Sequence, residues 1–220
     1  MIKGIIFDMD GVLVDSEYTF LESKTELLKD AGFPMDISYQ YQFMGTTFEF
    51  MWQKMKEELG LPKSTAEYIQ DMNQRRAVMI QRDGIRGIKG AVPFVRHLAE
   101  SEVKLAVASS SPKTEILHNL TELGIADCFD ALVSGEEVAN SKPAPDVFLE
   151  AARQIGIAPA GCLAFEDTKN GSLAVKRAEM FCVGYENPDY PAQDLSQADQ
   201  VIRSFEGLSL ADLQQWFNAK

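Results

Sequence analysis

Short apolar segments alternate with helix-patterned segments along most of this chain, and that alternation limits its possible folds more than any other feature. Strand-like runs rich in β-branched, aromatic or small apolar residues are predicted at 2–7, 103–108, 129–134, 162–165 and 180–184. Helical patterns are predicted between and after them, at 91–99, 113–123, 145–155, 171–178 and 210–217. Such alternation favours a parallel sheet covered by helices on both faces. We therefore predict an α/β fold with a Rossmann-like parallel sheet.

One block interrupts this alternation, because no convincing strand is predicted between residues 16 and 88. Helical patterns occupy 16–32, 46–60 and 64–82. Ser64 followed by Glu67 is the pattern of a capping box at a helix start. The chain is therefore expected to form a core domain from residues 1–15 and 88–220, with a helical cap domain inserted at 16–87. Hinges are expected near 14–16 and 84–90, where a helical cap would open and close.

Apolar residues gather in the second helical pattern of the insert. Phe48, Phe50, Met51 and Trp52 follow one another closely. Their simplest interpretation is that they form the core of the insert, although a fraction of them facing a substrate is the alternative.

The composition excludes several kinds of function. The chain has 220 residues and a net charge of −12, which argues against a nucleic-acid binder because phosphates require a basic face. A small phosphorylated ligand is still compatible, since a local field can oppose the global charge. The three cysteines contain no CxxC pair, so neither a zinc site nor a disulfide framework is indicated. We expect a soluble, cytoplasmic protein, because no apolar segment is long enough to cross a membrane and the N-terminal run is too short for a signal peptide. We also expect it to be a monomer.

Polar residues follow several of the predicted strands at the point where each strand ends. In open parallel sheets, ligands bind beyond the carboxyl ends of the strands. The residues expected to meet there are Asp8, Asp10, Ser109, Lys142, Glu166 and Asp167. This convergence is a stronger signal than any one of the short motifs.

These residue types indicate phosphoryl transfer assisted by a metal. Clustered carboxylates repel one another and need a cation, and hard oxygen ligands suit Mg²⁺. Asp8 is expected to attack phosphorus and to form an aspartyl-phosphate. Asp10 would protonate the leaving oxygen and later take a proton from water. Ser109 and Lys142 would hold the phosphoryl oxygens.

Each residue also has a less specific interpretation. An Asp-x-Asp-Gly pattern alone is weak, since turns are rich in these residues. Any serine of the run that includes Ser110 and Ser111 could cap the next helix. Lys142 could be an ordinary solvated lysine. Asp15 and Asp146 are expected to be structural, through turn or cap hydrogen bonds.

Four segments resemble the four motifs of the haloacid dehalogenase superfamily in order and spacing. The segment from Asp8 to Ser16 resembles the first motif, and Ser109 after its apolar strand resembles the second. Lys142, within Ser-Lys-Pro-Ala-Pro-Asp, resembles the third. The segment 165–171, Phe-Glu-Asp-Thr-Lys-Asn-Gly, resembles the fourth. The resemblance covers essentially the whole chain, and the helical insert is similar to the C1-type cap of that superfamily.

The nearest subgroup by resemblance contains the β-phosphoglucomutase-like phosphatases and phosphohexomutases. The resemblance implies the haloacid dehalogenase fold and Mg²⁺ as cofactor. It also implies metal ligands: the Asp8 side chain, the Asp10 backbone carbonyl and Asp167. Glu166 would lie close by, either as a direct ligand or as a partner of the ligands, and both possibilities stay open.

The insert departs from the mutase pattern at two places. Thr19 or Phe20 stands where those mutases carry a cap-linker histidine, and Phe48 stands where they carry a phosphate-gripping arginine. Arg75 and Arg76 could supply positive charge from another helix. Because an apolar side chain does not replace a bidentate phosphate grip, we favour hydrolysis of a small phosphomonoester, such as a sugar phosphate, by an enzyme acting on phosphoric monoesters.

Two other functions compete with this interpretation. A phosphohexomutase of the β-phosphoglucomutase type is the first, and a non-catalytic regulatory protein that binds a phosphorylated metabolite is the second, since a fold and its motifs do not prove turnover. Carbon–halogen cleavage is disfavoured because it requires neither the Asp10 acid nor a magnesium cluster. Phosphonate hydrolysis is disfavoured because no lysine of the insert lies in a recognisable motif.

Overall fold

The protein, described by a computed structural model over residues 1–44 and 46–219, divides into two compact units. The core unit comprises Met1–Asp15 and Ile85–Lys220, and the cap unit comprises Ser16–Gly84. The second boundary therefore lies at residues 84–85 rather than at the expected 87–88. The reason is local: the last cap helix continues to Asp83 and ends at Gly84, whose φ of 74° interrupts the helix.

The core unit contains a sheet of six parallel strands in the order β3-β2-β1-β4-β5-β6. The strands are β1 (Gly4–Phe7), β2 (Lys104–Ser109), β3 (Ala131–Ser134), β4 (Cys162–Glu166), β5 (Phe181–Tyr185) and β6 (Gln200–Ile202). The predicted parallel sheet is thus present. Its last strand was not predicted, because it is a short edge strand directly after the polar segment 186–199 and carries little apolar signal.

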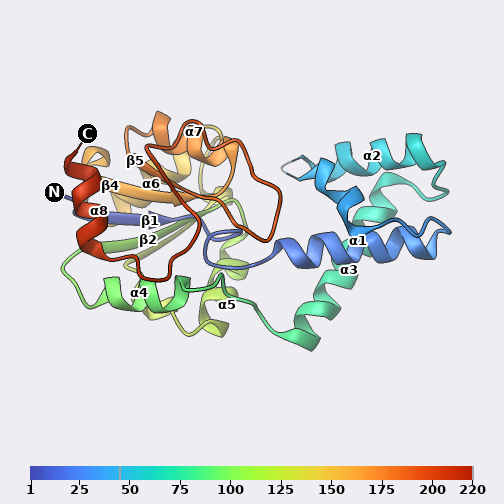
Figure 1. Ribbon diagram of the computed structural model, residues 1–220, viewed down its shortest axis with the longest axis horizontal. Coiled ribbons are helices and arrows are strands. Elements are labelled where there is room, and N and C mark those ends of the chain that lie inside the picture. The colour runs from blue at the N-terminus through green and yellow to red at the C-terminus, as the bar shows by residue number, and fades with distance from the viewer. Residues whose placement is uncertain (45, 220) are drawn as a thin grey trace. The chain divides into compact units, whose positions relative to one another are not determined.

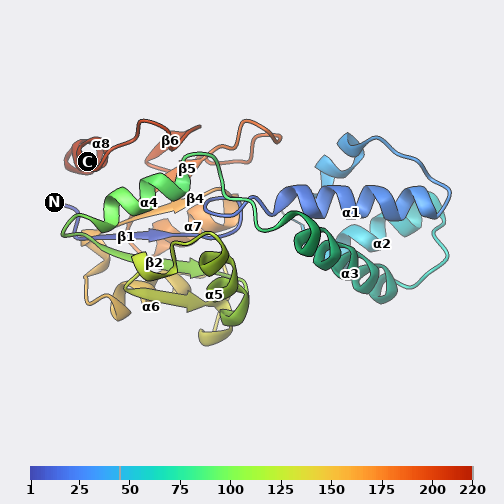
Figure 2. The same ribbon diagram turned by 90° about the horizontal axis from the view of Figure 1, so that it is seen from below.

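The helices of the core unit cover both faces of this sheet (Figures 1 and 2). They are α4 (Ala91–Ala99), α5 (Lys113–Glu122), α6 (Asp146–Gln154), α7 (Lys169–Arg177) and α8 (Leu210–Asn218). Short 3₁₀ turns are η2 (Ala126–Cys128), η3 (Gly135–Glu137) and η4 (Pro159–Gly161).

Strand alternation divides the core into two layers. Ile5 and Phe7 point to the layer that includes residues of α4, α5 and α8. Ile6 points to the opposite layer, with residues of α6 and α7. Because successive strand residues face opposite sides, a strand buried on both faces must be apolar throughout, as the sequence of β1 is. Cys162 and Cys182 fill space in the second layer as free thiols.

The strand order places a topological switch at the centre of the sheet. β1 pairs with β2 on one side and with β4 on the other. Chain connections leave these neighbouring strands toward opposite faces, which opens a crevice at their carboxyl ends. The residues that follow β1, β2, β3 and β4 are those singled out by the sequence.

The cap unit is helical, and no strand occurs among its described residues. Its elements are α1 (Glu17–Asp30), η1 (Ile37–Phe43), α2 (Phe48–Leu59) and α3 (Thr65–Asp83). The predicted capping box is present at the start of α3, where Ser64 and Glu67 exchange hydrogen bonds. Its core includes Trp52, which is fully buried and stacks on Tyr68 with ring centroids 4.7 Å apart.

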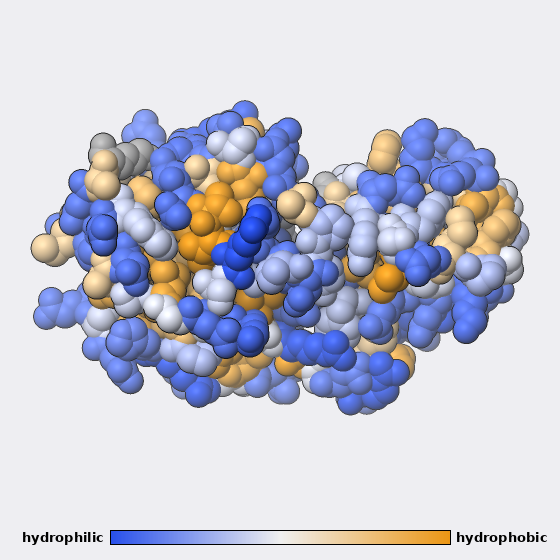
Figure 3. All heavy atoms as spheres, viewed as in Figure 1, coloured by the Kyte–Doolittle hydropathy of each residue, from blue (hydrophilic) through white to orange (hydrophobic). Residues whose placement is uncertain are grey.

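Hydrophilic residues cover most of the visible surface of each unit, with smaller hydrophobic areas between them (Figure 3). Large exposed apolar side chains occur on separate helices, among them Phe50 on α2, Val78 on α3 and Leu117 on α5. Within the described residues, no helix combines the length and the apolar character needed to cross a bilayer.

Candidate active site

Asp8 lies directly after the central strand, between the ends of β2 and β4. Phe7 is in register with Val107 on one side and Phe165 on the other, and the backbone N–H of Asp8 donates to the Phe165 carbonyl at 3.0 Å. The side chain is almost fully buried, with 6% of the residue exposed. A buried carboxylate at a sheet edge needs a partner, because its desolvation is costly otherwise.

A tight turn after Asp8 positions Asp10. The Met9 carbonyl accepts hydrogen bonds from the N–H groups of Leu13 and Val14 at 2.8 and 2.9 Å. Gly11 adopts a φ of 81°, a conformation that favours glycine. The turn therefore brings Asp10 back beside the end of the strand, where the sequence pattern expected it.

Lys142 is the buried partner of Asp8. Its Nζ lies 2.5 Å from Asp8 Oδ1 and 2.8 Å from Glu166 Oε1. The three side chains are 9%, 8% and 2% exposed, so Lys142 is not the solvated loop lysine of the alternative interpretation. The Phe148 ring lies beneath the ammonium, 4.8 Å from Nζ. Lys142 therefore neutralises two carboxylates that come from different strands.

Burial raises the pKa of Asp8 to about 7, and the Lys142 ammonium opposes this rise. The carboxylates of Glu166 and Asp10 add to it, because each disfavours a further negative charge. Burial alone would lower the pKa of Lys142, but Asp8 and Glu166 hold it above its usual range. The site thus favours a cation next to Asp8, and one lysine is shared between two acids.

Three carboxylates form a group that suits a metal ion. Asp8, Glu166 and Asp167 each offer an oxygen, and these oxygens lie within 4.8 Å of one another. Two glycines, Gly11 and Gly171, leave the space that two of these carboxylates occupy. A Cβ on Gly11 would lie 2.1 Å from Asp167 Oδ2, and a Cβ on Gly171 would lie 1.7 Å from Glu166 Oε1. Hard oxygen donors held in a glycine-lined recess fit Mg²⁺.

Ser109 occupies the position expected of it, at the end of β2 and 1% exposed. Its Oγ accepts a hydrogen bond from the Ser111 N–H at 3.0 Å. The helix-capping interpretation of this serine run is wrong, because Pro112 holds the N-cap position of α5 with no side-chain cap. Ser110 is exposed, whereas the Ser111 hydroxyl donates to Asp10 Oδ2 at 2.8 Å.

Sequence reasoning missed two residues that contact the site. Ser111 was assigned no place in the site, yet it contacts Asp10. Thr168 donates to Glu166 Oε2 through both its N–H, at 2.8 Å, and its hydroxyl, at 2.9 Å. Thr168 is also the N-cap of α7, and its position two residues after a strand-end Glu is the signal that could have identified it.

Asp15 and Asp146 make hydrogen bonds away from the carboxylates around Asp8. Asp15 Oδ1 accepts a hydrogen bond from the Tyr190 hydroxyl at 2.8 Å. Asp146 Oδ2 accepts from the N–H and the side-chain amide of Asn140, at 3.2 and 3.0 Å. Neither residue belongs to the group of carboxylates around Asp8.

Residues 5–185 match the family described as haloacid dehalogenase-like hydrolase. The chain belongs to this family. The resemblance inferred from the four sequence motifs is thereby confirmed.

Individual members of the haloacid dehalogenase-like family match almost the full length of the chain. Hexitol phosphatase B of Escherichia coli is 30% identical and the match covers 96% of each chain. β-Phosphoglucomutase of Bacillus subtilis is 31% identical, over 97% of this chain and 95% of that one. Family members of this similarity thus include both phosphatases and a mutase.

A solved structure supports the fold. The haloacid dehalogenase family hydrolase of Deinococcus radiodurans, crystallised with bound phosphate and sodium, superposes with a TM-score of 0.85. It is 26% identical, and the alignment covers 98% of this chain and 97% of that one. The predicted α/β core with an inserted helical segment is therefore the fold of the family.

Proposed function

We propose that this protein is a Mg²⁺-dependent phosphatase that hydrolyses a small phosphomonoester through an aspartyl-phosphate on Asp8. The observation that carries the proposal is the environment of Asp8: a buried carboxylate 2.5 Å from the Lys142 ammonium, within a group of three carboxylates and two residues before Asp10. This set contains a nucleophile, a fixed cation, a metal site and a proton carrier.

The first chemical step transfers the phosphoryl group to the protein. An Asp8 carboxylate oxygen attacks phosphorus while the bond from phosphorus to the ester oxygen breaks. Asp10 donates its proton to the departing oxygen, so that an alcohol leaves rather than an alkoxide. Ser109 and Lys142 hold the phosphoryl oxygens during this transfer, which depends mainly on positioning and charge neutralisation.

The second step returns the protein to its starting state. Asp10 takes a proton from water, whose oxygen attacks phosphorus as the bond to Asp8 breaks. Inorganic phosphate leaves, and Asp10 is again protonated.

Mg²⁺ would be held by Asp8, Asp167 and the backbone carbonyl of Asp10, with Glu166 beside it. Mg²⁺ there would neutralise the negative charge that otherwise keeps an anionic phosphate away from Asp8. Glu166 already accepts hydrogen bonds from Thr168 on Oε2 and from Lys142 on Oε1. We propose that Glu166 orients Lys142 and lies beside the metal, since each of its oxygens already accepts a hydrogen bond from a neighbouring residue.

The cap unit favours hydrolysis over mutase activity. Phe48 packs against the cap core, and its ring centroid lies 5.3 Å from that of Phe20. Thr19 is buried, donates to the Ser16 carbonyl at 2.8 Å and accepts from Arg76 Nε at 3.1 Å. Neither Phe48 nor Thr19 offers the cationic or imidazole chemistry of the mutase pattern at these places.

The names of similar proteins support a substrate class. Proteins named for phosphatase activity on phosphorylated carbohydrates and on a hexitol phosphate are similar to this chain over most of its length. We propose a small phosphorylated metabolite, such as a sugar phosphate, as the substrate.

The test is phosphate release from a panel of phosphorylated metabolites, with Mg²⁺ and with EDTA. Wild type should release phosphate only with the metal. Asp8→Asn should abolish release, and Asp130→Asn should not, because Asp130 forms a partly exposed ion pair with Lys104 at the opposite end of β2. Full activity in Asp8→Asn would refute the assigned nucleophile.

The same panel separates the competing functions. Isomerisation of a hexose 1-phosphate without net phosphate release would identify a mutase. Tight binding of a phosphorylated metabolite by wild type, with no turnover of any compound, would identify a regulatory binding protein.

A further inference from the structure

Ser111 connects the two polar residues that end β1 and β2. Its hydroxyl donates to Asp10 Oδ2 at 2.8 Å, and its backbone N–H donates to Ser109 Oγ at 3.0 Å. Its carbonyl accepts a hydrogen bond from the Ser134 hydroxyl at 2.7 Å. One residue therefore links the proton carrier, the expected phosphate-binding serine and the end of β3.

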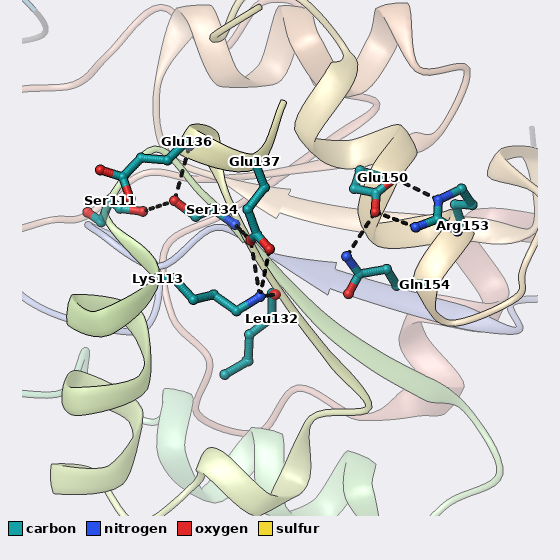
Figure 4. Close-up of polar contacts among 9 residues, drawn as sticks. All are labelled: Ser111, Lys113, Leu132, Ser134, Glu136, Glu137, Glu150, Arg153 and Gln154. Atoms are coloured by element: carbon teal, nitrogen blue, oxygen red, sulfur yellow. Dashed lines mark hydrogen bonds and ion pairs between the residues drawn. The ribbon is translucent and has the colours of Figure 1, made fainter. Parts of the chain in front are cut away.

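Ser134, behind Ser111, is itself held by several contacts (Figure 4). It is fully buried, and its Oγ also accepts from the Glu136 N–H at 3.1 Å. Its N–H donates to Glu137 Oε2 at 2.7 Å, and Glu137 pairs with Lys113 at 3.0 Å. The end of β3 therefore forms a fixed support for the Ser111 carbonyl.

The backbone of the two strand ends packs closely as well. A Cβ on Gly135 would lie 3.2 Å from Ser110 Cα and 3.6 Å from the Ser109 carbonyl oxygen. The backbone of Ser109 and Ser110 therefore passes close to Gly135 at the end of β3. The Ser111 hydroxyl is presented to Asp10 from a segment held by this close packing and by the hydrogen bond to Ser134.

The hydrogen bond from Ser111 engages only one oxygen of Asp10. An aspartate side chain turns easily about its terminal torsion, and a proton carrier works only when one oxygen faces the reacting atom. With Oδ2 held by Ser111, Oδ1 is left to carry the proton.

We propose that Ser111 is a positioning residue that orients the Asp10 carboxylate for proton transfer, and that Ser134 holds Ser111 in place for this purpose. The inference rests on the proposed function, since it requires Asp10 to act as general acid and base. It assigns to the serine run a role beyond phosphate binding by Ser109.

Such a role has a measurable signature, because proton donation matters most for poor leaving groups. Phenyl phosphate and p-nitrophenyl phosphate have similar shapes, but p-nitrophenolate departs readily without a proton. The ratio kcat/KM reports the reaction up to loss of the leaving group, so it isolates the step in which Asp10 donates. A defect in orientation should therefore appear in kcat/KM for phenyl phosphate and much less for p-nitrophenyl phosphate.

The experiment compares four variants with wild type on both substrates. Ser111→Ala should lower kcat/KM for phenyl phosphate about 10-fold, a fraction of what a general acid contributes, and for p-nitrophenyl phosphate about 2-fold or less. Ser111→Thr keeps a hydroxyl and should restore the wild-type ratio. Ser110→Ala changes the exposed neighbour and should leave both values unchanged. Asp10→Asn should show the same selectivity as Ser111→Ala, but with a larger loss.

Ser134→Ala extends the test to the support. It should lower kcat/KM for phenyl phosphate more than for p-nitrophenyl phosphate, as Ser111→Ala does. The decrease should be smaller than in Ser111→Ala, because the Ser111 hydroxyl itself is retained. Melting temperatures of all variants identify any that fail to fold. If Ser111→Ala fails to fold, the comparison of Ser111→Thr with wild type still tests the role of the hydroxyl.

The outcomes separate the inference from the proposed function. Equal losses on both substrates, or a change in KM alone, would overturn the positioning role of Ser111. If Asp10→Asn selectively lowers kcat/KM for phenyl phosphate and Ser111→Ala does not, the inference is overturned and the proposed function still stands. An Asp10→Asn without selectivity, or a folded wild type that releases phosphate neither from these two substrates nor from any compound of the metabolite panel, would overturn the proposed function itself.

Discussion

Lys142 Nζ lies 2.5 Å from Asp8 Oδ1, and both side chains are more than nine-tenths buried. Removing one partner of a buried ion pair leaves an uncompensated charge, so Lys142→Ala should destabilise the metal-free protein by about 3–5 kcal/mol. Mg²⁺ should recover part of this loss, because it neutralises the same carboxylates. Urea unfolding in EDTA and in Mg²⁺ measures both effects.

Lys104→Ala is the matched control for that substitution. Lys104 pairs with Asp130 at 2.7 Å, but its side chain is 52% exposed. Surface pairs contribute about 0–1 kcal/mol, so the control should change stability little in either buffer. Equal destabilisation by the two substitutions would contradict the buried-pair argument.

Gly171 offers a test of the recess around Glu166. An added Cβ would lie 1.7 Å from Glu166 Oε1, so Gly171→Ala must displace that carboxylate from Lys142. Alanine is a better helix former than glycine, and the substitution should therefore not weaken α7. The Mg²⁺ concentration needed for half-maximal activity should rise about 10- to 100-fold, as for other changes beside metal ligands.

Gly161→Ala controls for the added methyl group. Its Cβ would lie 3.3 Å from the Ile157 Cγ2 atom, which is the nearest atom, and far from the acids. Its magnesium requirement should match that of wild type. An unchanged requirement in Gly171→Ala would show that the position of Glu166 is unimportant for the metal.

Lys24 gives the cap unit a pH-dependent stability. It is 4% exposed, and burial lowers its pKa from 10.5 to about 8, with Glu17 opposing and Arg76 adding to the shift. Between these two values the unfolded chain binds the proton and the folded one does not, so stability rises with pH from about 8 to 10.5. Below pH 8 Lys24 is protonated in both states, so the full free-energy cost of burying its charge lowers the stability of the folded chain.

Lys24→Met should remove that penalty. At pH 7 it should stabilise the cap unit by up to about 3 kcal/mol, since one pKa unit corresponds to 1.36 kcal/mol, and the rise above pH 8 should disappear. Thermal unfolding across pH 7–10.5 is the measurement. Lys29→Met, at an exposed position of the same helix, should leave the pH profile as in wild type; a retained pH rise in Lys24→Met would refute the assignment.

Trp52 tests whether the aromatic cluster of the insert is core or substrate surface. Because its side chain is fully buried and stacked on Tyr68, Trp52→Ala should cost about 3–5 kcal/mol in cap stability. Phe50→Ala, at a residue that is 52% exposed on the same helix, should stay within about 0.5 kcal/mol of wild type. The reverse ranking in a denaturant titration would contradict the core interpretation.

The sequence by itself determined the fold class and predicted which residues would gather at the candidate site. A parallel strand buried on both faces must be apolar throughout, so the strands around Phe7, Val107 and Phe165 could be recognised from composition and spacing alone. Polar residues immediately after such strands must meet at one edge, which predicted Asp8, Ser109 and the other members of the site. Local rules also sufficed for the capping box at Ser64.

Only the tertiary structure decided which of these residues contact one another. The hydrogen bond from Ser111 to Asp10 joins residues far apart in the sequence, and no local pattern encodes which serine of a run will face a neighbouring strand end. Gly11 and Gly171 belong to the sequence motifs, but only the placed carboxylates of Asp167 and Glu166 show why a Cβ cannot fit at either position. Register between strands sets these distances, and it arises from packing over the whole sheet rather than from any single segment.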